Sequence, residues 1–226
     1  MKAVILAAGY GKRMMPYTKN KPKPLINVNG NPFLYYMLKK LKTAGITEIG
    51  IVYSDKKEKY EEFFEKYGFK AQLLNQPIPL GTGDALKYAE EFTKDDEFLV
   101  LPGDCLFSER DIKKIIDSKY ENAVLACHRK DTHKYGVIEK KNGCLKKIIE
   151  KPKNYGPGLV NTSIYKLDKS IYKYLKDLKK SERGEYELTD AVTQLVNEKD
   201  IYVEELKHYW LDFGTPKDIP VVEEKL

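Results

Sequence analysis

Residues 6–25, LAAGYGKRMMPYTKNKPKPL, begin at the end of a short apolar segment, 2–7, that is typical of a buried strand. The stretch has five basic side chains and no acidic one: Lys12, Arg13, Lys19, Lys21 and Lys23. Small residues at positions 7, 8, 9 and 11 let backbone N–H groups approach oxygen atoms closely. Prolines at 16, 22 and 24 restrict the loop, so less entropy is lost when a ligand orders it. Because open α/β sheets bind ligands at the carboxyl ends of their strands, the stretch predicts a polyphosphate-binding loop.

Two well-known glycine-rich loops do not fit these residues. A dinucleotide-binding fingerprint needs Gly or Ala at position 14, which is Met14. A P-loop needs Gly at position 6 and Ser or Thr at position 13, which are Leu6 and Arg13. From the glycines alone, an ordinary basic loop between a strand and a helix is equally compatible. The whole twenty-residue string favours the polyphosphate-binding loop.

The rest of the chain alternates between strand-like and helical segments. Strands are expected near 2–7, 48–53, 70–75 and 97–101, with helices near 32–43, 56–67, after Gly83 and near 108–119. This order predicts an α/β fold with a Rossmann-like, mostly parallel central sheet and helices on both faces. Strands near 123–129, 136–140, 144–150 and 159–166 then follow one another closely, with Asn142-Gly143 as a hairpin turn. Helices near 168–179 and 188–197, a strand at 201–205 and a short helix after Thr215 come last.

Length and composition are those of one folded domain. The 226 residues are 42% hydrophobic, without a linker, an internal repeat or a hexapeptide array after Asp218, so we expect a single domain, 1–226, with no C-terminal β-helix. No apolar run approaches the ~18 residues of a membrane-spanning helix. The net charge of +6 suits an anionic ligand, but a solvated lysine-rich surface explains it equally well. Three widely spaced cysteines and no recognised nucleic-acid-binding motif favour a cytoplasmic protein with neither a membrane nor a nucleic-acid partner.

Two aspartates follow expected strands. Asp104 comes after Pro102-Gly103 at the end of the fourth strand, and Asp212 lies in the segment WLDFGTP, 210–216. Mg²⁺ is usually held by one or two carboxylates, with substrate phosphates and waters as the other ligands. Either aspartate alone is equally typical of a helix cap or a turn. Asp104 and Asp212, at adjacent strand ends, would together supply such a magnesium site.

Residues 6–25 resemble the N-terminal signature of the nucleoside-diphosphate-sugar pyrophosphorylases, or sugar-1-phosphate nucleotidyltransferases, LAAGxGxRxxPxTxxxPKPL, and match every fixed position. Asp104 and Asp212 are similar to the GD and WxDxGTP motifs of this family, and the resemblance extends to about residue 218. Within the family, the chain resembles the glucose-1-phosphate thymidylyl- and uridylyltransferases. The resemblance implies the nucleotide-diphospho-sugar transferase fold, with a smaller β-rich sugar-binding subregion.

The resemblance also implies roles for single residues of the loop and of the sugar site. Arg13 and Lys23 would contact the triphosphate and the sugar phosphate as catalytic residues, and the backbone at Ala8, Gly9 and Gly11 would hold the nucleotide. The family usually has Thr or Ser at position 12, where this chain has Lys12. On the sugar side, the implied residues are Gly136, Glu150, Lys151 and Asn161: Glu150 accepts from hydroxyls, Lys151 binds the phosphate, and Asn161 and the Gly136 backbone contact the ring. Without the resemblance, Glu150-Lys151 is a charged strand end. The segment 184–190, GEYELTD, is similar to a family segment near the sugar, but it equally predicts a helix cap and is not included in the site.

The base is expected to bind at the loop 76–83, QPIPLGTG, between a strand and a helix. A glutamine amide can donate and accept, as can the edge of uracil or thymine, and Gly81 lets the backbone approach the ring. The loop is also similar to the Q-x₄-G loop of family members that use pyrimidines, which implies that Gln76, Gly81 and Thr82 bind nucleotide. The alternative is a turn rich in proline and glycine with an exposed glutamine.

We therefore expect a nucleotidyltransferase that condenses UTP or dTTP with a sugar 1-phosphate, with Mg²⁺ and by direct in-line attack. The phosphate monoester is already anionic at neutral pH, so no general base is needed. Glucose 1-phosphate is expected to be slightly better than N-acetylglucosamine 1-phosphate; the alternative is an N-acetylglucosamine-1-phosphate uridylyltransferase or another sugar specificity. An alternative of a different class is a catalytically inactive regulatory or assembly module. The expected state is a monomer or a small homo-oligomer.

Overall fold

The computed structural model describes residues 1–94, 96–153 and 156–226. Within these residues, nine strands form one sheet in the order β5-β4-β1-β6-β11-β8-β12-β10-β9. Its first four strands are parallel: β5 (Gln72–Asn75), β4 (Glu48–Tyr53), β1 (Lys2–Leu6) and β6 (Phe98–Pro102). They are connected through α1 (Phe33–Thr43), α2 (Lys57–Tyr67), α3 (Thr82–Lys87) and α4 (Glu90–Thr93). The expected α/β pattern therefore holds for the first half of the chain.

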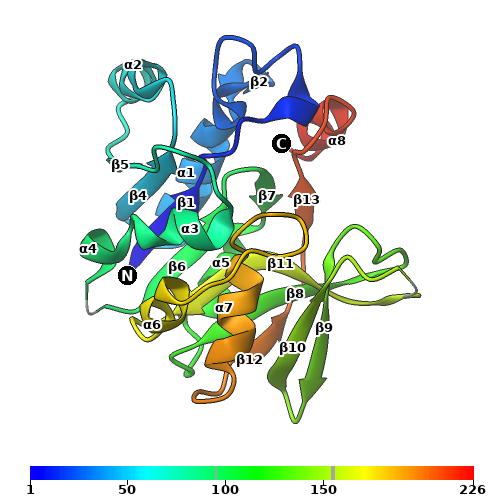
Figure 1. Ribbon diagram of the computed structural model, residues 1–226. Helices are drawn as coiled ribbons and strands as arrows, with labels where there is room; N and C mark the ends of the chain where they lie inside the picture. The colour runs from blue at the N-terminus through cyan, green and yellow to red at the C-terminus, as the bar shows by residue number, and fades with distance from the viewer. Residues whose placement is uncertain (95, 154–155) are drawn as a thin grey trace.

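The sheet as a whole is mixed, so the prediction of a mostly parallel sheet was wrong. Strand β11 (Gly158–Leu167) lies antiparallel between β6 and β8 (Ala123–Arg129), whereas β12 (Tyr202–Glu205) is parallel to β8. Strands β9 (Gly136–Lys141) and β10 (Cys144–Glu150) form an antiparallel hairpin that extends from the rest of the molecule (Figure 1). Its turn is Asn142-Gly143, with φ of 52° and 80°. A turn this short connects only antiparallel strands, because parallel ones need a long crossover.

Hydrophobic cores lie on both faces of the sheet, as expected for a buried α/β sheet. On β1, Ala3 and Ile5 point into one core and Val4 into the other, because successive side chains of a strand alternate between faces. One core is covered by α1, α2 and α5 (Glu109–Ile116), the other by α3, α6 (Ile171–Lys176) and α7 (Leu188–Leu195). On α1, apolar residues at helical spacing are all buried: Phe33, Leu34, Met37, Leu38 and Leu41.

Short elements close the carboxyl end of the sheet. Strand β7 (Cys105–Phe107) pairs antiparallel with β13 (Trp210–Asp212), and β2 (Asn27–Val28) pairs with β3 (Asn31–Pro32). The 3₁₀ helices η1 (Lys12–Met14) and η2 (Lys23–Leu25) lie within the phosphate loop, and α8 (Asp218–Lys225) ends the chain beside β2. Asp212 is therefore the last residue of a strand in a separate small sheet. The pairing of β13 with β7, which directly follows β6, brings Asp212 to the end of β6. Among the described residues, no helix is long and apolar enough to span a membrane.

Candidate active site

Two adjacent cavities lie at the carboxyl end of the parallel strands. The larger, of about 720 Å³, is bordered by β9, β10, β11 and β13 and by the start of α7. The smaller, of about 420 Å³, is bordered by the phosphate loop, 6–25, and by the loop 76–82. Leu6, at the end of β1, and Thr82, at the start of α3, line both. The cavities therefore meet at a boundary formed by these two residues.

The phosphate loop contributes to both cavities. Ala8, Gly9, Gly11 and Lys12 line the smaller cavity, whereas Arg13 is exposed and lines the larger one. Gly11 has a φ of 63°, and a Cβ there would lie 2.9 Å from Thr18 Cγ2, so only glycine fits without strain. The buried Thr18 donates from Oγ1 to Gly11 O at 3.0 Å. The backbone thus bends sharply just before its basic side chains.

Asp104 and Asp212 lie close together although 108 positions separate them in sequence. Asp212 is opposite Cys105 in the β13–β7 pair, and Phe213 N donates to Asp104 O at 2.8 Å. Both carboxylates line the larger cavity. Lys23 Nζ lies 2.5 Å from Asp104 Oδ2. The helix η2 of the phosphate loop therefore places the lysine ammonium group against this carboxylate.

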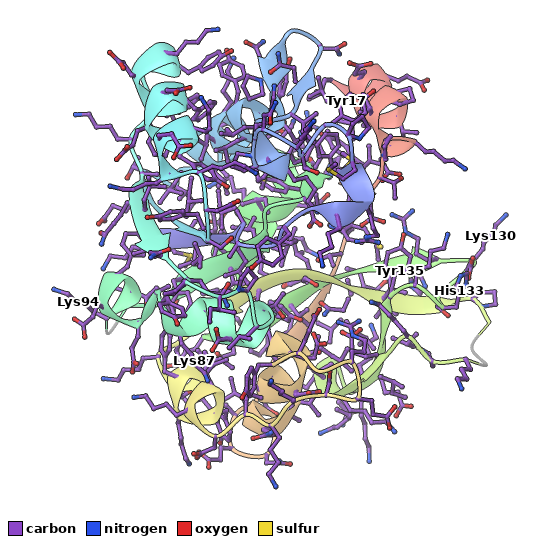
Figure 2. The ribbon with its side chains drawn as sticks, turned by 45° about the horizontal axis from the view of Figure 1, so that its top comes forward. Tyr17, Lys87, Lys94, Lys130, His133 and Tyr135 are labelled. Atoms are coloured by element: carbon purple, nitrogen blue, oxygen red, sulfur yellow. The ribbon has the colours of Figure 1, made fainter. Side chains whose placement is uncertain are left out.

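Asp212 is held by neighbours on β8 and on the segment before β9. Tyr135 OH donates to Asp212 Oδ2 at 2.7 Å, and the Arg129 guanidinium lies over the Tyr135 and Trp210 rings (Figure 2 labels Tyr135). Burial raises the pKa of Asp212, the Tyr135 hydrogen bond lowers it and the charge of Asp104 raises it. Burial, together with the bond to Asp212, raises the pKa of the Tyr135 hydroxyl. Tyr135 therefore acts as a hydrogen-bond donor that fixes the orientation of Asp212.

The two carboxylates fit a magnesium ion better than a transition metal. In the ranges 1–94, 96–153 and 156–226, no group of three or more His, Cys, Asp or Glu side chains is arranged to hold a metal. Structural zinc sites need four such ligands, whereas Mg²⁺ is commonly held by one or two carboxylates with phosphates and waters. Asp104 and Asp212 supply these two carboxylates at the cavity wall.

The residues predicted for the sugar all line the larger cavity: Gly136, Glu150, Lys151 and Asn161. A Cβ at Gly136 would lie 2.7 Å from Ile148 Cγ2 and 3.2 Å from Glu150 Oε1, so a side chain here would collide with this wall. Asn161 Oδ1 accepts from Ser163 N at 2.9 Å, and Asn161 Nδ2 donates to Tyr165 OH at 2.5 Å. These bonds fix the orientation of the Asn161 amide. One N–H group and one lone pair of Oδ1 remain available to hydrogen-bond a ligand.

The same cavity includes residues that were not predicted. Arg183 is paired with the buried Glu187 at 2.6 Å, and Thr189 Oγ1 is buried without a hydrogen-bond partner among the described residues. Burial raises the pKa of Glu187, and the charge of Arg183 lowers it. The signal for Glu187 and Thr189 was present in the segment 184–190, which was not included because a helix cap explained it equally well.

Gln76 is buried, with 1% of its surface exposed, and lines the smaller cavity with Gly81 and Thr82. The alternative of an exposed glutamine is therefore wrong. Gly81 has a φ of 122°, and a Cβ there would lie 2.5 Å from Tyr186 O. The loop is bound to the segment before α7: Tyr186 N donates to Leu80 O, Gly83 N donates to Tyr186 O, both at 2.8 Å, and Leu188 N donates to Thr82 Oγ1 at 3.0 Å.

A comparison with protein families identifies the chain, because the nucleotidyl transferase family profile matches residues 2–226. The chain belongs to the nucleotidyl transferase family. The family membership predicted from the sequence is thereby confirmed.

Several curated proteins resemble this nucleotidyl transferase along nearly its whole length. The bifunctional protein GlmU of Methanocaldococcus jannaschii is 38% identical over 97% of this chain and 52% of its own. A bifunctional sugar-1-phosphate nucleotidylyltransferase/acetyltransferase of Sulfurisphaera tokodaii is 38% identical over 97% of this chain and 54% of its own. A proposed UTP–glucose-1-phosphate uridylyltransferase of M. jannaschii is 32% identical over 94% of this chain and 88% of its own. The chain spans about half the length of the bifunctional relatives.

Solved structures agree with the fold of this nucleotidyl transferase. A proposed glucose-1-phosphate thymidylyltransferase of Bacillus anthracis, in complex with a sucrose, superposes with a TM-score of 0.87 at 30% identity over 100% of this chain and 94% of its own. A UDP-glucose pyrophosphorylase complexed with UDP-glucose superposes with a TM-score of 0.88 at 23% identity, over 99% of this chain and 97% of its own. At that identity, the second comparison supports the fold alone. The single domain, cytoplasmic location and oligomeric state stay predictions.

Proposed function

We propose that this chain transfers the nucleotidyl group of UTP or dTTP to a sugar 1-phosphate and releases pyrophosphate. The observation that carries the proposal is the meeting of the two cavities at Leu6 and Thr82, with Arg13 and the two aspartates in the wall of the larger cavity. A nucleotide in the smaller cavity and a sugar phosphate in the larger one would place their phosphates side by side. Holding two reactants in this way replaces a bimolecular encounter by a local one.

In the proposed reaction, an oxygen of the sugar phosphate attacks the α-phosphorus of the nucleotide. A new P–O bond forms, the bond from the α-phosphorus to the oxygen bridging the β-phosphate breaks, and pyrophosphate leaves with that electron pair. Arg13 and Lys23 supply fixed positive charge, which stabilises negative charge developing on the phosphates. Mg²⁺ held by Asp104 and Asp212 would add a divalent charge at the same place. No proton has to be removed from the attacking oxygen, since the phosphate is already ionised.

For the acceptor, we propose N-acetylglucosamine 1-phosphate ahead of glucose 1-phosphate, which reverses the order expected from the sequence. The relatives with 36–41% identity are mostly named GlmU, whereas the one named for glucose 1-phosphate is 32% identical. A further relative combines nucleotidyl transfer with acetyl transfer in its name, in keeping with an acetylated amino sugar. In the larger cavity, the Thr189 hydroxyl has no hydrogen-bond partner within the described ranges and offers a donor and an acceptor for such a substituent.

The test is a panel assay of pyrophosphate release that combines UTP, dTTP, CTP, ATP and GTP with N-acetylglucosamine 1-phosphate and glucose 1-phosphate. We expect the highest kcat/KM for UTP or dTTP with N-acetylglucosamine 1-phosphate. A preference for a purine nucleotide or CTP would refute the proposed base, and a clear preference for glucose 1-phosphate would refute the proposed acceptor. No release with any pair would support the inactive regulatory module instead.

A further inference from the structure

Behind Gln76 lies a buried acidic residue, Asp84, on the first turn of α3. Gln76 lines the smaller cavity, whereas Asp84, with 8% of its surface exposed, is not part of the cavity wall in the described residues. Gln76 Nε2 lies 2.7 Å from Asp84 Oδ2 and 3.5 Å from Gly81 O. Among the described residues, the side chain of Gln76 makes two hydrogen bonds, and its NH₂ group is the donor in both.

The carboxylate determines which way the amide of Gln76 is turned. A carboxylate accepts hydrogen bonds but donates none, so the NH₂ group of the amide faces Asp84 and the oxygen faces away. The opposite orientation would place the Gln76 oxygen against a carboxylate oxygen in a buried place, which is costly. Lys87, one turn further along α3, lies on the other side of the carboxylate, 3.8 Å from Asp84 Oδ1 (Figure 2 labels Lys87).

We infer that Asp84 is a positioning residue for base recognition, because it engages the NH₂ group of Gln76 and leaves the amide oxygen as the group that Gln76 offers to the base. This inference rests on the proposed function, in which the base occupies the smaller cavity. An acceptor on the protein selects a base with a donor opposite it. Opposite N3, uracil and thymine have a donor, the N3–H group, whereas cytosine has a lone pair there and its own donor, the 4-amino group, lies one ring position away; the inference therefore places the Gln76 oxygen opposite N3. Asp84 thereby acts through Gln76 to favour UTP and dTTP over CTP.

The experiment compares kcat/KM for UTP and CTP, at saturating sugar 1-phosphate, in the wild type and in Asp84→Asn. Asparagine can donate or accept, and its oxygen is drawn toward Lys87, so the Gln76 amide is free to turn. We expect the UTP/CTP ratio to fall about tenfold, the size of one neutral hydrogen bond, through the KM of the nucleotide. The KM of the sugar phosphate stays unchanged. Asp84→Glu keeps the carboxylate and restores most of the ratio, and Asp117→Asn, an exposed control with the same change in charge, leaves it unchanged.

A double-mutant cycle separates positioning from a general structural effect. In a Gln76→Ala background, Asp84→Asn should not change the UTP/CTP ratio further, because Asp84 acts through the amide. An unchanged ratio in Asp84→Asn alone, or additive effects of the two substitutions, would overturn the inference. If Asp84→Asn unfolds, Asp84→Ser is tested in its place, because a serine hydroxyl can also donate or accept and no longer fixes the amide of Gln76. A fall of about tenfold in the UTP/CTP ratio supports the inference, and an unchanged ratio overturns it.

The same measurements distinguish failure of the inference from failure of the proposed function. If the wild type prefers a purine nucleotide, the proposed base is wrong, but the UTP/CTP ratios of the cycle still decide whether Asp84 acts through Gln76; if it prefers CTP over UTP, the proposed base and the inference are both wrong. If the chain turns over no nucleotide, calorimetric binding of UTP and CTP to the same variants gives the ratio. Equal binding of both nucleotides by the wild type would overturn the inference.

Discussion

Replacing Tyr135 by phenylalanine removes one hydroxyl, the donor to Asp212 Oδ2 at 2.7 Å. Hydrogen bonds to charged groups contribute about 1.5–3 kcal/mol to stability, and loss of a residue that orients a metal ligand typically costs about 10–100-fold in metal affinity or activity. Tyr135 is partly exposed, so we take the lower end of both ranges. We therefore expect the Mg²⁺ concentration for half-maximal activity to rise about tenfold, with much of the maximal rate recovered at saturating Mg²⁺.

The assay is pyrophosphate release as a function of Mg²⁺ concentration, at saturating nucleotide and sugar 1-phosphate. Tyr60→Phe is a matched control, because the Tyr60 hydroxyl is buried on α2, without a hydrogen-bond partner among the described residues. The control should keep the wild-type dependence on Mg²⁺. If Tyr135→Phe also keeps it, or loses maximal rate with no change in that dependence, then Tyr135 does not position Asp212 for a metal.

Further predictions concern the metal site, the sugar phosphate and the stability of the fold. Asp104→Asn and Asp212→Asn should each lower kcat at least about 100-fold, as the loss of a preorganised electrostatic group does, and a chelator should abolish wild-type activity. Near-normal rates of either variant in excess Mg²⁺ would exclude that aspartate from the metal site. Lys151→Ala should raise the KM of the sugar 1-phosphate far more than that of the nucleotide. Equal effects on the two KM values would indicate that Lys151 is a surface charge and does not bind the sugar phosphate. Burial raises the pKa of Asp168, but hydrogen bonds led by that from Lys199 outweigh this and lower it from 3.8 to about 2. Asp168 therefore stabilises the fold above pH 4, and this contribution disappears as the pH falls toward 2. After a discount for solvent screening, Asp168→Asn should cost about 1–2 kcal/mol at pH 7 in urea unfolding and little at pH 2; an equal cost at both would contradict the linkage.

The fold could be predicted where its pattern is local. The strands 48–53, 123–129 and 144–150 have the observed bounds, because apolar residues predominate there and polar or turn residues flank them. The direction of β11 could not be predicted, since it depends on which strands lie beside it and not on its own residues. Strands β7 and β13 are three residues long, too short for any periodicity, and form only because they pair with each other.

In the candidate site too, residues in local motifs could be predicted and contacts between distant residues could not. The predicted residues at positions 8–13 and 76–82 lie in continuous motifs, those at 136–161 were implied by the resemblance, and all of them line the two cavities. Tyr135 and Asp84 were not predicted. The hydrogen bond from Tyr135 to Asp212 joins residues 77 positions apart, and that from Gln76 to Asp84 depends on how a loop folds back over the first turn of a helix. No local pattern reports such contacts. The roles of all these residues stay predictions until the variants are measured.

The hydrogen bonds of Tyr186 have a consequence for attempts to redesign the substrates. Its backbone holds Leu80 and Gly83 of the loop beside Gln76, while the residues that follow it, Glu187 and Thr189, line the larger cavity. A loop grafted from an enzyme with another base preference would have to present matching backbone groups to Tyr186, or it would displace the wall of the neighbouring cavity as well. The loop proposed to bind the base and the wall of the cavity proposed for the sugar are therefore not separate modules. Exchanging 76–84 and 183–190 together would transfer both sides of these hydrogen bonds.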